Sequence, residues 1–124
     1  DIRLPVGITT DVLAARLDEW LAPLEGVSWK AIRRFEPSFT DPGHEIVTRT
    51  ASVAAEVLGE TPAVNMRVGG SDSRWYRMFD VPTVVLGLTP FNMGGADEYV
   101  LVDELLAVAK IHTLVAYDFL SAEP

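Results

Sequence analysis

The predicted fold class rests on residues 65–99, which read NMRVGGSDSRWYRMFDVPTVVLGLTPFNMGGADEY. The stretch contains the end of one apolar run, 63–68, and all of a second, 82–88, and each run leads into a turn that carries glycine and polar side chains. The second run is nearly all apolar, which is typical of a strand buried on both faces of a sheet. Because ligands bind beyond the carboxyl ends of strands in open α/β sheets, we expect a binding site in these turns.

The rest of the chain alternates between strand-like and helix-like segments. Residues 1–5 and 27–35 alternate polar and apolar side chains, as half-buried strands do. We expect four helices, begun by Thr10, by Asp41-Pro42, by Ser71 or Asp72, and by Asp103. Gly26 and Gly59 are expected to end the first two of them. This order of elements predicts an α/β fold.

Composition excludes several classes of function. The chain has 124 residues, 48% of them hydrophobic, and a net charge of −8, which argues against nucleic acid and anionic membrane surfaces as partners. No apolar run is long enough to span a bilayer. The absence of cysteine excludes disulfides and fits a cytoplasmic protein. The chain opens at Asp1 without a signal-like region, and we interpret it as a segment excised from a longer protein.

The loop Gly69-Gly70-Ser71-Asp72 is the first candidate site. Two glycines allow a sharp turn and a close approach to a ligand, and the following helix would offer free N–H groups to an anion. The Ser71 hydroxyl and the Arg74 guanidinium would add donors for a carboxylate. The alternative is an ordinary strand–helix turn in which Asp72 only caps the helix.

Two further features allow a functional and a structural interpretation. Asp97 and Glu98 follow a glycine turn and could bind a metal or orient a ligand, but adjacent acids are also typical of a solvated first turn before a helix. His112 lies on the apolar stripe of the last expected helix, which favours a core histidine over a metal ligand.

Taken together, these segments resemble the C-terminal part of the acetylornithine deacetylase/succinyl-diaminopimelate desuccinylase/glutamate carboxypeptidase family of zinc-dependent amide hydrolases. The resemblance covers essentially the whole chain in order and spacing. It is carried by the pieces DIRLP (1–5), TDP (40–42), GGSDSR (69–74), VPTVV (81–85), DEYV (97–100) and VDELL (102–106).

The resemblance implies a fragment of a two-domain zinc-hydrolase fold. Residues 1–40 would be half of a ferredoxin-like lid, or dimerisation, domain, and residues 41–124 the closing α/β part of the catalytic domain. A change of composition with two prolines at 36–43 coincides with that junction. The implied substrate-binding residues are Arg3, Gly70, Ser71, Asp72, Arg74 and Asn92.

The implied activity belongs to the longer protein, which would hydrolyse an N-acyl or peptide amide bond next to a carboxylate with bound zinc. The family's late metal-binding histidine has no counterpart in residues 89–95, where Asn92 could take a substituted role. This chain is therefore expected to position substrate, to contribute no catalytic residue, to hold no zinc alone and to form a homo-oligomer. The alternative is a non-enzymatic dimerisation or interaction module, or a degenerate relative that lost its metal.

Overall fold

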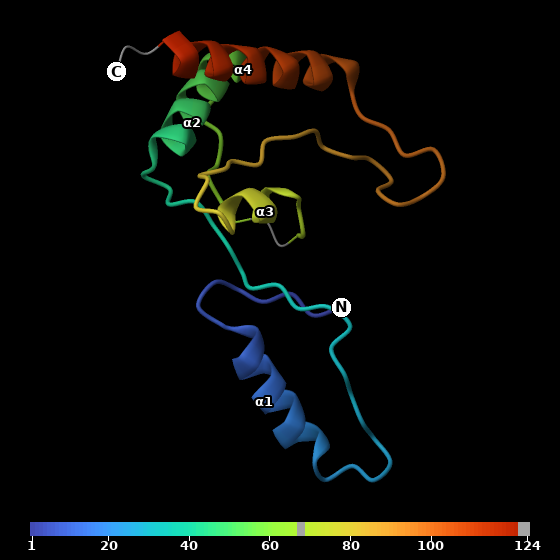
Figure 1. Cartoon of the computed structure of the whole chain (residues 1–124). Coiled ribbons are helices and arrows are strands. Elements are labelled where there is room, and N and C mark those ends of the chain that lie inside the picture. The colour runs from blue at the N-terminus through green and yellow to red at the C-terminus, as the bar shows by residue number, and fades with distance from the viewer. Residues whose placement is uncertain (67–68, 122–124) are drawn as a thin grey trace.

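Four helices make up the regular structure of the computed structural model, which describes residues 1–66 and 69–121. They are α1 (Thr10–Leu21), α2 (Glu45–Leu58), α3 (Ser73–Arg77) and α4 (Val102–Ser121). The helices α2 and α4 pack against each other at one end of the molecule, and α1 lies at the other end with α3 between them (Figure 1). Within the described residues, no helix is both long and apolar enough to cross a membrane.

The α/β fold predicted from the sequence is wrong, and so is its assignment to half of a ferredoxin-like lid and the closing α/β part of a zinc-hydrolase fold. The described residues contain no sheet, and their β pairing is one isolated antiparallel bridge between Phe91 and Tyr99. The expected strands 1–5, 27–35 and 82–88 form no ladder. The same holds for the described part of 63–68, whose last two residues lie outside the described residues.

The physical reason is that a strand exists only through the backbone of a neighbouring strand. Residues 82–88 have the apolar composition of a buried strand. At the start of this segment, however, the backbone is hydrogen-bonded to a side chain and not to a second strand. The Thr83 N–H donates to Oγ1 of Thr40 at 2.9 Å, and the Thr83 carbonyl accepts from the same hydroxyl at 2.8 Å. A side chain thus occupies the groups that a second strand would use.

The helices α1 and α2 do not begin where the sequence predicted, because other residues than the expected ones cap them. Thr9, rather than Thr10, caps α1 by accepting a hydrogen bond from the Val12 N–H at 3.3 Å. His44 caps α2 through Nδ1, whereas Asp41, four residues before the helix, accepts from the Gly43 N–H. Gly59 ends α2 in the left-handed conformation, with φ 75°, as its sequence position predicted.

The core is small and lies between α2 and α4. Its centre consists of Val53 and Ala54 from α2 and Ile111 from α4, with Val57, Leu86 and Val115 partly buried around them. The chain exposes 9755 Å² in all. A compact monomer of 13.6 kDa exposes about 6,600 Å². The chain therefore leaves much more of its surface in contact with solvent than a compact monomer would.

Ile111→Ala should lower the free energy of unfolding by about 3 kcal/mol, because it leaves a cavity at the contact between α2 and α4. Leu120→Ala serves as the matched control in the same helix, since Leu120 is 88% exposed and should lose less than about 0.5 kcal/mol. Urea unfolding followed by circular dichroism measures both. Similar losses for the two variants would contradict the assignment of the core.

Candidate anion-binding site

Two arginine side chains from distant parts of the chain converge at Gly70. A Cβ atom placed on Gly70 would lie 3.2 Å from Nη1 of Arg74 and 3.8 Å from Nη1 of Arg3. Arg3 precedes α1 and Arg74 belongs to α3. Because glycine has no side chain, the space beside its backbone is left open to both guanidinium groups. A small ligand at this position would meet two positive charges at once.

Aromatic rings hold the Arg74 guanidinium in place. Its Cζ lies 4.1 Å from the ring centroid of Phe35 and 5.1 Å from that of Trp75. The two rings meet edge to face, with their centroids 5.6 Å apart and their planes at 88°. Cation–π attraction fixes the guanidinium without using its N–H groups, which stay available as donors.

The positive charge at the site is not balanced within the part of the chain that is described. Arg74 forms no salt bridge with a described carboxylate, and its Nε is buried without a hydrogen-bond partner. Arg3 pairs with Asp1 at 2.6 Å, but both side chains are well exposed, and such pairs are weak. Two guanidinium groups side by side repel each other, so an anion between them would be stabilised.

Arg77, in the same helix as Arg74, has a different environment. Its Nη1 donates to the Ser38 carbonyl at 3.3 Å, and its Nη2 donates to the Thr83 carbonyl at 2.8 Å. These bonds join α3 to two other segments of the chain. Arg77 is therefore a structural residue, whereas the Arg74 guanidinium contacts aromatic rings and forms no salt bridge with a described carboxylate.

Ser71 and Asp72 flank the site without completing it as predicted. The Ser71 hydroxyl is hydrogen-bonded to the Ser73 hydroxyl, so part of its hydrogen-bonding capacity is already used locally. Asp72 is exposed, and its side chain makes no capping bond to α3. Because α3 has only five residues, its N-terminus adds little to anion binding. The site depends on the guanidinium groups of Arg3 and Arg74.

Asn92 is not brought to this site. Its side-chain amide donates to the Ala96 carbonyl within its own turn, where Asn92 has a positive φ of 55°. In the same turn, the Glu98 carboxylate accepts from the Gly94 N–H at 3.1 Å. Figure 1 shows this turn at the far end of the loop that precedes α4, away from α3. The structure gives Asn92 and Glu98 local structural contacts.

The residues present do not fit a zinc ion. His44 Nδ1 accepts the capping hydrogen bond of α2, and Nε2 of His112 lies 3.3 Å from the Leu86 carbonyl. His112, expected in the core, is exposed. Within the described ranges, no three or more histidine, aspartate or glutamate side chains gather closely enough to hold a metal ion. No chemical step is therefore derived through zinc.

Sequence reasoning missed Phe35 and Trp75. Trp75 follows Arg74 directly, so an aromatic neighbour in the site could have been anticipated. Phe35 belongs to a segment that was expected to be a strand, and nothing in its spacing predicts contact with α3. The signal available in the sequence was only the aromatic residue itself, since cation–π partners have no fixed separation along a chain.

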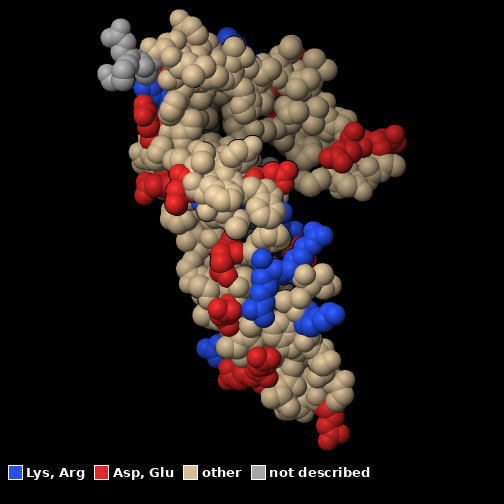
Figure 2. Space-filling model, viewed as in Figure 1, with Lys and Arg blue, Asp and Glu red and all other residues tan. Residues whose placement is uncertain are grey.

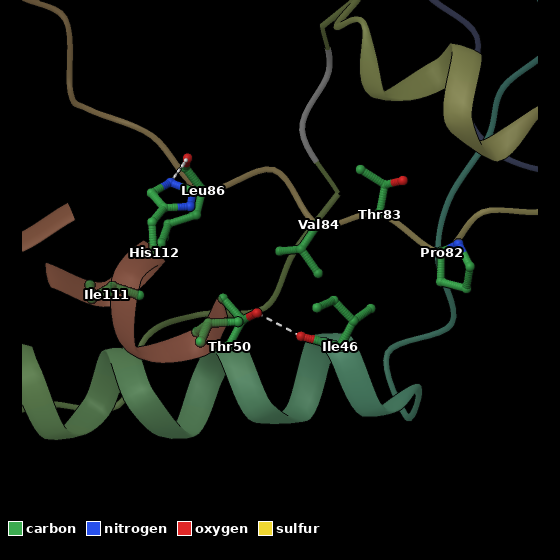
Figure 3. A pocket seen from close by; sticks show the side chains of 9 residues that line it. Ile46, Thr50, Pro82, Thr83, Val84, Leu86, Ile111 and His112 are labelled. Atoms are coloured by element: carbon green, nitrogen blue, oxygen red, sulfur yellow. Dashed lines mark hydrogen bonds between the residues drawn. The ribbon is translucent and has the colours of Figure 1, made fainter. Parts of the chain in front are cut away.

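A cavity of about 230 Å³ between α2, α4 and residues 82–86 is a poorer candidate (Figure 3). Its walls are mostly apolar, and its polar groups already have partners. The Thr50 hydroxyl donates to the Ile46 carbonyl at 2.6 Å, and His112 contacts the Leu86 carbonyl. With no polar group left to orient a ligand, we interpret this cavity as a gap at the edge of the core.

Charge is distributed unevenly around the candidate site. Figure 2 shows Lys and Arg side chains gathered over the middle of the molecule, near the N-terminus and α3, with acidic side chains around them. This local concentration of positive charge contrasts with the net charge of −8. An anionic ligand would thus be attracted to this region in particular.

Comparison with known proteins adds no relative: no family model, no curated protein and no solved structure matches the chain. The site is therefore interpreted from its own geometry.

The two arginines of α3 should differ in their effect on stability. Arg77→Met should lower the free energy of unfolding by about 2 kcal/mol, because it removes the donor of the Ser38 carbonyl and one of the two donors of the Thr83 carbonyl. Arg74→Met should change it by less than about 1 kcal/mol, since the lost cation–π contact is offset by relief of repulsion from Arg3. Thermal unfolding of the two variants measures this difference, and the reverse order would contradict the assignment.

The isolated chain should bind zinc more weakly than micromolar. It has no cysteine and only two histidines, and both histidines already have partners. Calorimetric titration with zinc at neutral pH measures this. A one-to-one complex tighter than micromolar would show that the ligand set has been misjudged.

Proposed function

We propose that this chain binds the carboxylate of a small N-acyl amino acid or peptide between Arg3 and Arg74. In this proposal it is the substrate-positioning part of a metal-dependent amide hydrolase. The observation that carries the proposal is the convergence of the two guanidinium groups at Gly70 without a balancing carboxylate on Arg74. The family resemblance of the GGSDSR segment, 69–74, supports the same ligand class.

The chemistry of the site suits a carboxylate. Each guanidinium offers N–H donors in a planar fork that matches two carboxylate oxygens, and such charged hydrogen bonds are short and strong. The lack of a side chain at Gly70 lets the Arg74 guanidinium approach the backbone closely, since a Cβ there would lie 3.2 Å from its Nη1. The Phe35 and Trp75 rings limit how far the Arg74 guanidinium can move. A ligand held in this way would be oriented by its carboxylate end.

Orientation is the whole contribution that we assign to these residues. Fixing the carboxylate places the neighbouring amide bond at a set distance and angle from any catalytic groups, which removes an entropic cost from the reaction. The metal and the groups that activate water are assigned to parts of the longer protein outside this chain. The chain alone is expected to bind but not to cleave.

A second candidate function is a non-enzymatic interaction module. The specific observation in its favour is the large exposed surface, which includes many apolar side chains on α1, on α4 and in the loops. Exposed apolar surface on this scale marks contact with another chain. The two candidates differ in their ligand, since the first needs a carboxylate and the second needs a protein surface.

Binding of N-acetyl-L-alanine to the chain tests the proposal. Isothermal titration should detect one site, and Arg74→Met should weaken binding about tenfold or more, because it removes a charged hydrogen-bond donor. N-acetyl-L-alaninamide, which has a neutral amide in place of the carboxylate, should not bind measurably.

Arg16→Met is the matched control, because Arg16 is 61% exposed and pairs only with Glu19 on the surface of α1. This variant should bind the ligand as the unchanged chain does. Equal affinity for the acid and the amide, or equal weakening by both arginine variants, would contradict the assigned site.

A further inference from the structure

The helix α4 has a continuous uncharged stripe on the face opposite its contact with α2. At 100° per residue, eight exposed residues lie within about 60° of the direction opposite the buried Ile111. This outer stripe consists of Val102, Leu105, Leu106, Ala109, Thr113, Ala116, Tyr117 and Leu120. The charged residues of the helix, Asp103, Glu104, Lys110 and Asp118, all lie off the stripe. The face therefore offers apolar contact without charge.

The large side chains of the outer stripe are strongly exposed to solvent. Val102 is 69% exposed, Tyr117 67% and Leu120 88%. A wide uncharged face on a helix is normally covered by another element, and α4 has a described helix partner only on its opposite face. The excess of exposed surface over a compact monomer, about 3,200 Å², is larger than the roughly 800 Å² that one partner gives to a standard interface.

The order of large and small residues along the stripe indicates what covers it. Large side chains stand at both ends, Val102 and Leu106 at the start and Tyr117 and Leu120 at the finish, with alanine and threonine between them. If a second α4 packs along this stripe in either direction, the large ends face each other and the small centres meet, which allows close approach. The spacing of three and four residues is that of a seam between two helices.

The distribution of charge along α4 favours the antiparallel direction. A chain with net charge −8 repels a second copy, but the stripe itself carries no charge that would face its own image. In an antiparallel pair, the acidic first turns with Asp103 and Glu104 lie at opposite ends, and the helix dipoles oppose each other. A parallel pair would place these acids side by side.

We propose that two copies of this chain form a two-fold symmetric dimer in which the outer stripes of α4 pack antiparallel. The contact is isologous, with the same residues contributed by each copy. The occupant of the stripe is thus a second α4.

Sedimentation velocity of the full chain between about 1 and 100 μM tests the proposal. We expect a species of twice 13.6 kDa that dissociates on dilution. Leu106→Glu should raise the dimer dissociation constant at least 100-fold, because it buries a charge without a partner in the seam. Leu106 is 63% exposed, so its helix should stay intact by circular dichroism.

Trp20→Glu is the matched control, because Trp20 is 62% exposed on α1 and should not contribute to the dimer. A single-cysteine pair gives a second measurement, since the chain has no cysteine of its own. Thr113→Cys, at the centre of the stripe, should be joined between copies by a short bismaleimide, and Asp118→Cys, off the stripe, should not.

Four results would overturn the proposal. They are a monomer at every concentration, a dimer that Leu106→Glu leaves intact, equal loss of the dimer in Trp20→Glu, and equally fast cross-linking of both cysteine variants. A different protein that stays bound to the stripe through purification would also overturn it, because the occupant would then not be a second copy.

Discussion

The packing of Ile111 against α2 is the contact on which the rest of the structure depends. Val53, Ala54 and Ile111 form the buried centre, and α2 and α4 are the one pair of helices in substantial contact among the described residues. Other segments are joined by hydrogen bonds or ring contacts, some to α3 and some to α1, as Trp29 is through Asp18. Such contacts contribute less free energy than apolar burial does, so the position of the loops depends on a few named bonds. Those to Thr83 and Ser38 are the clearest cases.

The candidate site exists because one of these weaker connections joins the two ends of the molecule. Phe35, from the segment that precedes α2, meets Arg74 and Trp75 of α3, while Arg3 comes from the N-terminus. The convergence of Arg3 and Arg74 is unfavourable for the protein alone, because like charges repel across a short distance. Features that disfavour the folded chain and favour a bound ligand are typical of binding sites. The location of Arg77, with both Nη groups satisfied, shows what a purely structural arginine looks like in the same helix.

The presence of the helices was predictable from the sequence, although α1 ends at Leu21 and not at Gly26 as predicted, and the absence of a sheet was not predictable. Each helix has its own local signals, such as Gly59 at the end of α2, and a helix satisfies its backbone within one segment. A strand signal is different, since the alternation in 27–35 or the apolar run 82–88 says only that a segment suits a sheet, and the partner has to come from elsewhere. The same limit applies to the site. Gly70, Ser71 and Arg74 were found because they are neighbours in the chain, whereas no spacing rule brings Phe35 to them.

The dimer and the carboxylate site make separate demands on the chain and do not compete. Figure 1 shows α4 at one end of the molecule and the N-terminus near the middle, so pairing through the outer stripe would leave Arg3 and Arg74 accessible to a ligand. Pairing would place the α2–α4 core of each copy next to that of its partner, and α4 would then be covered on two sides. The chain exposes about half as much surface again as a compact monomer would. Covering the uncharged face of α4 would remove apolar surface from solvent and so stabilise the pair. In the proposed dimer, the position of α4 at the core, rather than the carboxylate site, therefore determines where the second copy would bind.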